Sequence, residues 1–345
     1  MNKEYRILIA ILLTGIVGVG VWWVILGNSQ IINSQILKSS NLLNPVGETV
    51  RKEMPYDKYS FERLAVRGGV ASPIEVSVNK FFYKSEGRRI SGEINYPITT
   101  VSNKMPVVVM ARGYVDKENY KTGIGTHNAA VVYAKAGYIT LAPDFSGYGE
   151  SDQEDENALG ARLVKPVEIL DLLASLSSIP QADLSRVYLW GHSNGGQIML
   201  SVVEILGMRE STGGHGGPPL RIRGVALWAP VSKPFPYNIL YYTDEADDQG
   251  KLLRSEIANF ERDYDVFQYS IDHYLDKITL PIQVHQGSAD DAVPKKWSDE
   301  LSKSLKEKEK QINYYVYPGA DHNMKPNWNT VVSRDVEWFN KLAED

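Results

Sequence analysis

Short apolar runs alternate with amphipathic helical patterns over most of this chain, and this alternation restricts the possible folds more than any other feature. The runs at 106–110, 138–142 and 224–228 are apolar almost throughout, which is typical of strands covered on both faces. Between them, segments such as 161–178 carry apolar residues at helical spacing. This order predicts an α/β domain with a mostly parallel sheet and helices on both faces.

We expect about eight strands in this sheet. The first two, over 74–83 and 89–96, are separated by a short charged turn and predict a hairpin that adds an antiparallel edge. The other expected strands cover 106–110, 138–142, 186–190, 224–228, 282–285 and 312–317. The expected helices cover 126–136, 161–178, 197–206, 298–308 and 331–342.

One segment interrupts the alternation, between the strands expected at 224–228 and 282–285. It is rich in tyrosine and charged residues, and helices are expected near 248–260 and 266–276. We interpret 232–278 as a small cap over the carboxyl edge of the sheet, where open α/β sheets bind ligands. A simple surface excursion is the alternative.

The N-terminal segment predicts a membrane anchor. Residues 7–27 contain no charged residue for 21 positions, which is long enough for a helix to cross a bilayer. Lys3 and Arg6 precede the segment, so the chain after residue 27 is expected on the extracytoplasmic side. A cleaved signal peptide and a buried helix are the alternatives. The predicted organisation is an anchor at 1–27, a polar stalk at 28–56 and a catalytic domain at 57–345.

The strongest chemical signal is a glycine-flanked serine between an expected strand and an expected helix. Gly191-His192-Ser193-Asn194-Gly195 directly follows the strand at 186–190. Small residues on both sides allow the sharp turn of a nucleophile elbow, which lifts the serine hydroxyl above the sheet. The backbone N–H of Asn194 is then a candidate oxyanion donor.

A base and an acid for Ser193 follow later in the chain. His322 lies just beyond the last expected strand, where a base can reach the elbow, and the five other histidines are less suited: His127, His192, His215, His273 and His285. Asp290 and Asp291 both follow the strand at 282–285, and the residues leave either one open as the acid. The order serine, acid, histidine is that of the α/β-hydrolase fold. The loop after the strand at 106–110 should give the second oxyanion donor, the N–H of Tyr114.

Four motifs resemble the catalytic domain of the prolyl oligopeptidase (S9) family of serine peptidases. They lie at 137–149, 191–196, 287–294 and 317–322, and the resemblance covers about residues 90–345. It implies that Asp290 is the acid, His322 the base and Tyr114 an oxyanion donor. No cofactor or metal is implied.

The chain also departs from that family. The residues before the fold leave no room for the β-propeller of the full-length peptidases, and Arg112 stands where related esterases often have histidine. We interpret Arg112 as a surface residue, with a role in holding a substrate carboxylate as the weaker alternative.

The expected function is therefore cleavage of a peptide, amide or ester substrate through an acyl-enzyme. A carboxylesterase of the acetyl-xylan or feruloyl esterase kind is the alternative, and a non-catalytic membrane-anchored binding module is a third. The formal net charge of −5 argues against a nucleic-acid partner. The absence of cysteine excludes disulfides, thiolate metal sites and a cysteine nucleophile.

Overall fold

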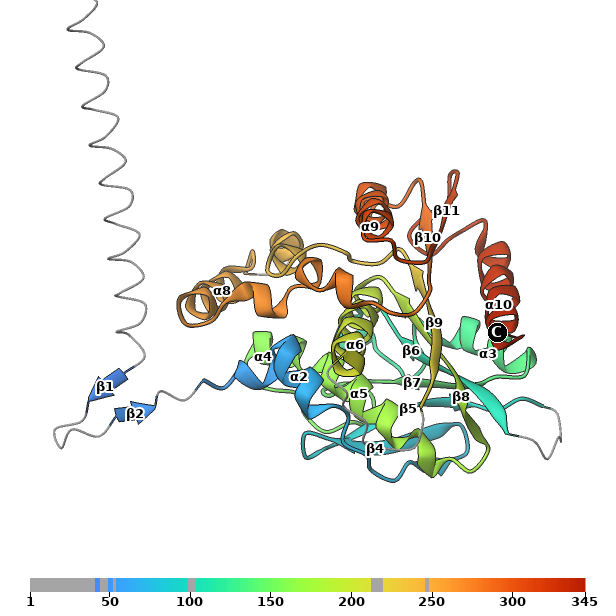
Figure 1. Cartoon of the computed structure of the whole chain (residues 1–345), viewed down its shortest axis with the longest axis horizontal. Coiled ribbons are helices and arrows are strands. Elements are labelled where there is room, and N and C mark those ends of the chain that lie inside the picture. The colour runs from blue at the N-terminus through green and yellow to red at the C-terminus, as the bar shows by residue number, and fades with distance from the viewer. Residues whose placement is uncertain are drawn as a thin grey trace, which may run out of the picture. The chain divides into compact units, whose positions relative to one another are not determined.

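The computed structural model describes residues 41–43, 49–51, 54–98, 104–211, 220–245 and 248–344. The chain separates into two compact units, Met1–Pro55 and Tyr56–Asp345. In the first unit, strands β1 (Asn41–Leu43) and β2 (Thr49–Arg51) pair in antiparallel orientation. The other helices and strands of the described residues all lie in the second unit (Figure 1).

A nine-stranded sheet runs through the second unit in the order β11-β10-β9-β8-β6-β7-β5-β4-β3. From β7 to β11 in this order every neighbouring pair is parallel, and β5, β4 and β3 continue the sheet in antiparallel pairing. The strands are β3 (Glu75–Ser77), β4 (Lys80–Ser85), β5 (Arg88–Asn95), β6 (Met105–Ala111), β7 (Ile139–Pro143), β8 (Ala182–His192), β9 (Ile222–Trp228), β10 (Ile282–Gly287) and β11 (Ile312–Tyr317).

The prediction of about eight strands is one too low because the strand expected at 74–83 folds back on itself. A two-residue turn at Val78 and Asn79 separates β3 from β4, with Ser77 paired to Lys80. Val78 adopts a left-handed backbone with φ of 57°, which a branched residue adopts only at a cost. Nothing in the alternation of residue types marks this turn, so the sequence pattern looked continuous.

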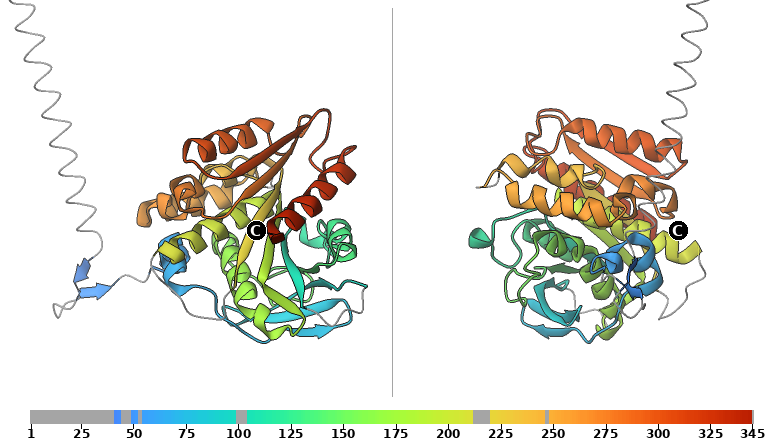
Figure 2. Two further views of the ribbon diagram at one scale, coloured as in Figure 1. Left: turned by 45° about the vertical axis from the view of Figure 1, so that its right-hand side comes forward. Right: turned by 90° about the vertical axis from the view of Figure 1, so that its left-hand side faces the viewer.

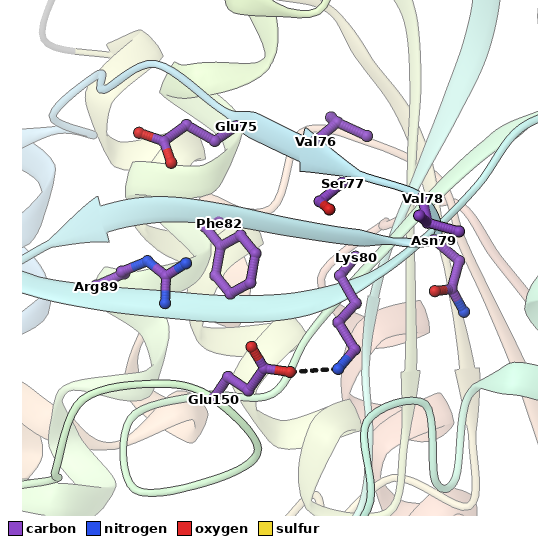
Figure 3. Close-up of a pocket in the computed structure, with 9 residues that line it drawn as sticks. All are labelled: Glu75, Val76, Ser77, Val78, Asn79, Lys80, Phe82, Arg89 and Glu150. Carbon is purple, nitrogen blue, oxygen red and sulfur yellow. Dashed lines mark hydrogen bonds and ion pairs between the residues drawn. The ribbon is translucent and has the colours of Figure 1, made fainter.

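The β3–β4 hairpin forms one wall of an open surface groove of about 700 Å³ (Figure 3). An ion pair between Lys80 and Glu150 crosses it, and the guanidinium of Arg89 lies 3.5 Å from the centre of the Phe82 ring. None of the predicted site residues lines this groove. It is therefore separate from the chemistry considered below.

Helices cover both faces of the sheet (Figure 2). Helices α2, α5 and α6 pack together on one face, and α3 and α10 pack together on the other. The helices are α2 (Phe61–Arg67), α3 (His127–Lys135), α4 (Ala158–Leu163), α5 (Lys165–Ser175), α6 (Asn194–Ser211), α7 (Tyr237–Leu240), α8 (Lys251–Asp263), α9 (Lys295–Glu307) and α10 (Trp328–Glu344).

Two hydrophobic cores lie on the two sides of the central strands. In β8, Val187 and Leu189 belong to the core under α5 and α6, whereas Tyr188 and Trp190 belong to the core under α3 and α10. Successive side chains of a strand point to opposite faces, so a strand apolar throughout supplies both cores. The expectation of a mostly parallel sheet covered on both faces is confirmed.

The segment 232–278 departs from its predicted helices. The helix expected near 248–260 is present as α8, but the helix expected at 266–276 is replaced by three 3₁₀ turns, Val266–Tyr269, Ile271–His273 and Leu275–Lys277. Tyr269, Ile271 and Leu275 are all buried, and their spacing of two and four residues does not fit one face of a continuous helix.

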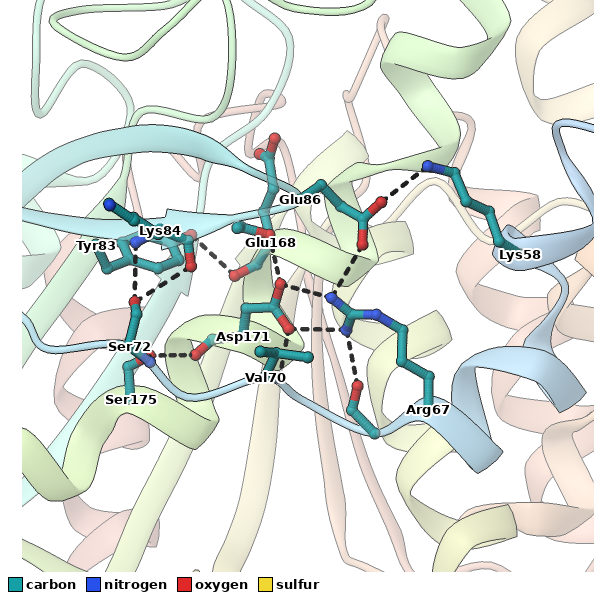
Figure 4. Close-up of polar contacts among 12 residues, drawn as sticks. Lys58, Arg67, Val70, Ser72, Tyr83, Lys84, Glu86, Glu168, Asp171 and Ser175 are labelled. Carbon is teal, nitrogen blue, oxygen red and sulfur yellow. Dashed lines mark hydrogen bonds and ion pairs between the residues drawn. The ribbon is translucent and has the colours of Figure 1, made fainter.

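A buried carboxylate on α5 attaches the first residues of the second unit to the sheet (Figure 4). Asp171 accepts two hydrogen bonds from the Arg67 guanidinium, at 2.8 and 2.9 Å. It also accepts hydrogen bonds from the backbone N–H of Val70 and the hydroxyl of Ser85. Because these donors come from α2, the following loop and β4, one side chain holds three segments together.

Within the described residues, no helix is both long and apolar enough to cross a bilayer. The predicted anchor at 7–27 lies outside those residues. It stays a prediction.

Candidate active site

Ser193 occupies a strained turn between a buried strand and a long helix. Strand β8 ends at His192 and helix α6 begins at Asn194, so a single residue makes the connection. Ser193 has φ of 56°, in the left-handed region that non-glycine residues seldom adopt. Its N–H donates to the carbonyl of Trp228, and its own carbonyl accepts from Val231. The ends of β8 and β9 therefore hold the turn in place.

The two flanking glycines are required by close backbone packing. A Cβ atom at Gly191 would lie 2.5 Å from the carbonyl oxygen of Gly195, and one at Gly195 would lie 2.0 Å from that of Ala111. Both distances are shorter than any real contact of this kind. The nucleophile elbow predicted from the sequence is therefore present in its full geometry.

The structure brings the predicted base and one of the two candidate acids together. Nδ1 of His322 lies 2.9 Å and 3.1 Å from the two carboxylate oxygens of Asp290. This bond places the ring proton on Nδ1 and leaves Nε2 as the basic atom. Asp291 is exposed. Of the two aspartates that the residues alone left open, the geometry therefore favours Asp290 as the acid.

The Asp290 carboxylate is buried and fully supplied with donors. Its side chain has no exposed surface, and it accepts hydrogen bonds from the backbone N–H groups of Ala292 and Val293 and from the amide of Gln286. Burial alone would raise the pKa of Asp290, but the hydrogen bonds with His322 and Val293 outweigh it and hold that pKa below its ordinary value. The carboxylate is therefore ionised at neutral pH and can stabilise an imidazolium.

His192 has a role that the sequence analysis did not find. Its Nε2 lies 2.9 Å from the carbonyl oxygen of His322, and the two imidazole rings are 4.6 Å apart. Burial, followed by the charge of His322, lowers the pKa of His192 to about 4. A neutral His192 with its proton on Nε2 therefore anchors the loop that carries His322 beside the elbow.

The two predicted oxyanion donors lie next to the serine. Asn194 begins α6, whose first N–H groups have no partner within the helix. Tyr114 follows Gly113, and a Cβ atom added to Gly113 would lie 3.0 Å from Cβ of Ser193. Among the described residues, neither the Tyr114 nor the Asn194 N–H donates a hydrogen bond. Both are available to a developing negative charge.

Of the remaining histidines, three lie in contacts that do not involve Ser193. His127, on the surface of α3, contacts Glu93 of β5, and His273 lies in an exposed turn. His285 is buried between Tyr317 and Asp335. His215 lies outside the described residues. The sequence-based choice of His322 among the six therefore agrees with the arrangement of the side chains.

A buried carboxylate on α10 organises the strand ends that carry the site. One oxygen of Asp335 accepts from Trp228 Nε1 and the Tyr133 hydroxyl, at 2.7 and 2.8 Å. The other accepts from Gln283 and His285, both at 2.9 Å. These donors lie on β9, β10 and α3, and Asp335 itself is completely buried.

Comparison with known proteins supports the fold and the chemical class. Residues 125–208 match the model of the prolyl oligopeptidase family, and residues 264–332 match that of the dienelactone hydrolase family. A curated relative is the dipeptidyl peptidase family member 6 of Caenorhabditis elegans, which is 22% identical over 286 residues. The alignment covers 82% of this chain but only 36% of that relative, so the chain spans about a third of its length.

Two solved structures illustrate the likeness. Est1E from Butyrivibrio proteoclasticus is 18% identical with a TM-score of 0.54, and the match covers 78% of this chain and 100% of that one. The acylaminoacyl peptidase of Pyrococcus horikoshii is 16% identical with a TM-score of 0.55, and the match covers 85% of this chain and 44% of that one. The chain has the α/β-hydrolase fold and is S9-like, and the family matches indicate a serine hydrolase.

Replacement of Asp335 with asparagine should destabilise the protein. Both carboxylate oxygens of Asp335 accept hydrogen bonds, whereas the amide nitrogen of asparagine is itself a donor. At least one buried donor would therefore lose its acceptor, and we expect a loss of about 2–4 kcal/mol in the free energy of unfolding. Urea denaturation of the full chain measures it. Glu337→Gln, on the exposed side of the same helix, is the matched control and should change little. Equal stability of the two variants would contradict the role assigned to Asp335.

Proposed function

We propose that this protein transfers the acyl group of an ester or amide to water through a covalent serine intermediate. Ser193 Oγ attacks the carbonyl carbon while Nε2 of His322 takes its proton, and the N–H groups of Tyr114 and Asn194 stabilise the oxyanion. The imidazolium then protonates the leaving group. Water, activated by the same nitrogen, attacks the acyl-enzyme, and the carboxylic acid leaves as Ser193 regains its proton.

One observation carries this proposal. The ionised, buried Asp290 holds His322 by its Nδ1 beside a serine in a strained left-handed turn. A buried carboxylate is costly unless its partners use the charge, and backbone strain at a single non-glycine residue is typical of functional sites. A non-catalytic binding module needs neither feature.

Two observations favour different bonds as the target. The match to the prolyl oligopeptidase family extends from α3 to most of α6, including Ser193, which favours a peptide or amide substrate. The match to Est1E extends over the whole of that chain, and another structure of Est1E holds ferulic acid, which favours a small ester. Both bonds are cleaved by the same triad, so the substrate pocket decides between them.

We include in the proposal that 232–278 acts as a cap over the site. The N–H of Val231, which leads into this segment, donates to the carbonyl of Ser193. Further along, Phe235 N–H is held by the hydroxyl of Ser270, and α8 contacts α4 on the body of the domain. A segment tied to the nucleophile at its start is well placed to shape the substrate pocket.

Hydrolysis of test substrates checks the proposed activity. The full chain should hydrolyse p-nitrophenyl acetate or a blocked dipeptide p-nitroanilide, and Ser193→Ala should lose on the order of 10⁴-fold or more in turnover. The ratio of kcat/KM for the two substrates separates esterase from peptidase. A fluorophosphonate probe should label the wild type and not Ser193→Ala. Absence of both labelling and hydrolysis would support a binding module instead.

The two adjacent aspartates provide a matched test of the acid. Asp290→Asn should lower kcat by roughly 10²- to 10⁴-fold, because an amide cannot hold Nδ1–H in the same way or stabilise the imidazolium. Asp291→Asn removes the same charge one residue away, from an exposed side chain, and should leave kcat almost unchanged. Equal losses in the two variants would refute the assignment of Asp290.

We also propose that residues 7–27 anchor the chain in a membrane, with the catalytic unit on the extracytoplasmic side. The support is the uncharged run of 21 residues after Lys3 and Arg6. On this basis the full chain should stay in the membrane fraction after carbonate extraction, and protease added to intact cells or spheroplasts should digest the catalytic unit. Release of a shortened protein into the medium would show a cleaved signal instead.

A further inference from the structure

Arg112, expected at the surface, is buried beside the nucleophile elbow. Only 3% of the residue is exposed. Its guanidinium carbon lies 4.3 Å from the centre of the Tyr120 ring and 4.1 Å from that of the Tyr148 ring. Among the described residues it forms no ion pair with a carboxylate. The structure therefore overturns the expectation of a surface arginine, and an anchor for a substrate carboxylate would need a more accessible group.

The guanidinium instead binds two backbone carbonyl groups. Nη1 donates to the oxygen of Gly113 at 2.9 Å, and Nη2 donates to the oxygen of Asp144 at 3.1 Å. Hydrogen bonds from a charged donor are roughly twice as strong as those between neutral groups. In a buried site they also fix the direction of their acceptors.

The first of these carbonyls belongs to the peptide group that contains the Tyr114 N–H. A peptide group is planar, and in the trans form its C=O and N–H point in opposite directions. Among the described residues the cis peptide bonds are at Phe235-Pro236 and Lys325-Pro326, so the Gly113–Tyr114 peptide is trans. Holding the Gly113 oxygen on the guanidinium side therefore fixes the Tyr114 N–H on the other side.

This peptide group would otherwise turn easily. Gly113 has no Cβ, so rotation about its backbone bonds meets little steric resistance. Close packing against Ser193 favours a glycine here, because an added Cβ atom would lie 3.0 Å from Cβ of the serine. The site thus needs a flexible residue at the point where a donor must be fixed.

We propose that Arg112 is a positioning residue that orients the Gly113–Tyr114 peptide so that the Tyr114 N–H faces the oxyanion. This assignment rests on the proposed acyl-serine chemistry. The guanidinium does not touch the substrate and acts through the peptide group. In its absence the carbonyl could turn toward the oxyanion, and one of the two donors would be lost.

The surroundings of Arg112 are arranged to hold it rigidly. Asp144, completely buried, accepts hydrogen bonds from the hydroxyls of Tyr120, Thr122 and Ser91. The Tyr120 ring, fixed in this way, covers one side of the guanidinium, and its pKa is raised by burial and by Asp144, so it remains an uncharged hydroxyl. A locked side chain is what preorganisation of an oxyanion donor requires.

A set of variants of the full chain tests this assignment with p-nitrophenyl acetate. Arg112→Met should lower kcat by about 10- to 100-fold with KM changed less than about twofold, because an oxyanion donor acts in the transition state. The rate of fluorophosphonate labelling should fall by a similar factor. Arg112→Lys and Arg112→Gln, which keep a donor, should recover part of the loss. Thermal melting of each variant reports folding.

Lys165→Met is the matched control. Lys165 is also buried and lies 5.8 Å from the rings of Phe145 and Tyr148, but it has no bond to the Gly113–Tyr114 peptide. Removing it takes away a buried basic group near the Tyr148 ring that Arg112 also contacts, and kcat should stay within about twofold of wild type.

The outcomes separate this proposal from the function on which it rests. An active wild type with kcat unchanged in a folded Arg112→Met would overturn the role of Arg112 alone. Equal losses in Arg112→Met and Lys165→Met would show a general effect of charge and also overturn it. If Arg112→Met does not fold, Arg112→Gln and Arg112→Lys decide, since wild-type kcat and a changed KM in both would contradict positioning. A wild type without labelling at Ser193 would overturn both proposals.

Discussion

A single buried carboxylate, that of Asp335, connects the helix α10 to the strand ends on which the site depends. Its donors include Trp228 at the end of β9 and His285 on β10. The carbonyl of Trp228 binds the N–H of Ser193, and β10 leads into the loop with Asp290. His285 in turn contacts the hydroxyl of Tyr317, the last residue of β11. The loops of Asp290 and His322 therefore follow strands of this hydrogen-bonded cluster, and the Ser193 turn is bound to the cluster through the carbonyl of Trp228.

The chemistry at the site depends on the same principle of fixing groups by buried hydrogen bonds. His192 binds the backbone carbonyl of His322, and Arg112 binds that of Gly113. The backbone N–H groups of Ala292 and Val293 bind the Asp290 carboxylate. Each contact requires the desolvation of polar groups during folding, and in the folded state it fixes the orientation of the group that it binds. Strain at Ser193 is tolerated for the same reason, because the end of β9 and the loop that follows it bind its backbone.

Much of this arrangement could be predicted from the sequence. Buried parallel strands are apolar throughout, so β6 to β9 were visible as runs, and the elbow was visible because glycine is needed on both sides of Ser193. Two local features of the backbone could not be predicted in this way, the turn between β3 and β4 and the 3₁₀ turns after α8. The turn at Val78 and Asn79 places a branched residue at the left-handed position, where glycine or asparagine is usual, and the 3₁₀ turns after α8 depend on which side chains the core accepts. Both errors concern segments whose conformation is set by packing.

The sequence by itself indicated the fold class and predicted Ser193 as the nucleophile, with an acid and a base following in that order, because glycine spacing, apolar runs and chain order are properties of the chain. The residues alone left both Asp290 and Asp291 open as the acid, since neighbouring carboxylates differ only in direction and burial, and the family resemblance implied Asp290. The sequence also placed Arg112 at the surface, the usual location of an arginine. Only the tertiary structure buried one aspartate against His322 and placed the arginine against a peptide group. Contacts between residues far apart in the sequence decide which of two identical side chains meets a partner, and local sequence patterns do not show those contacts.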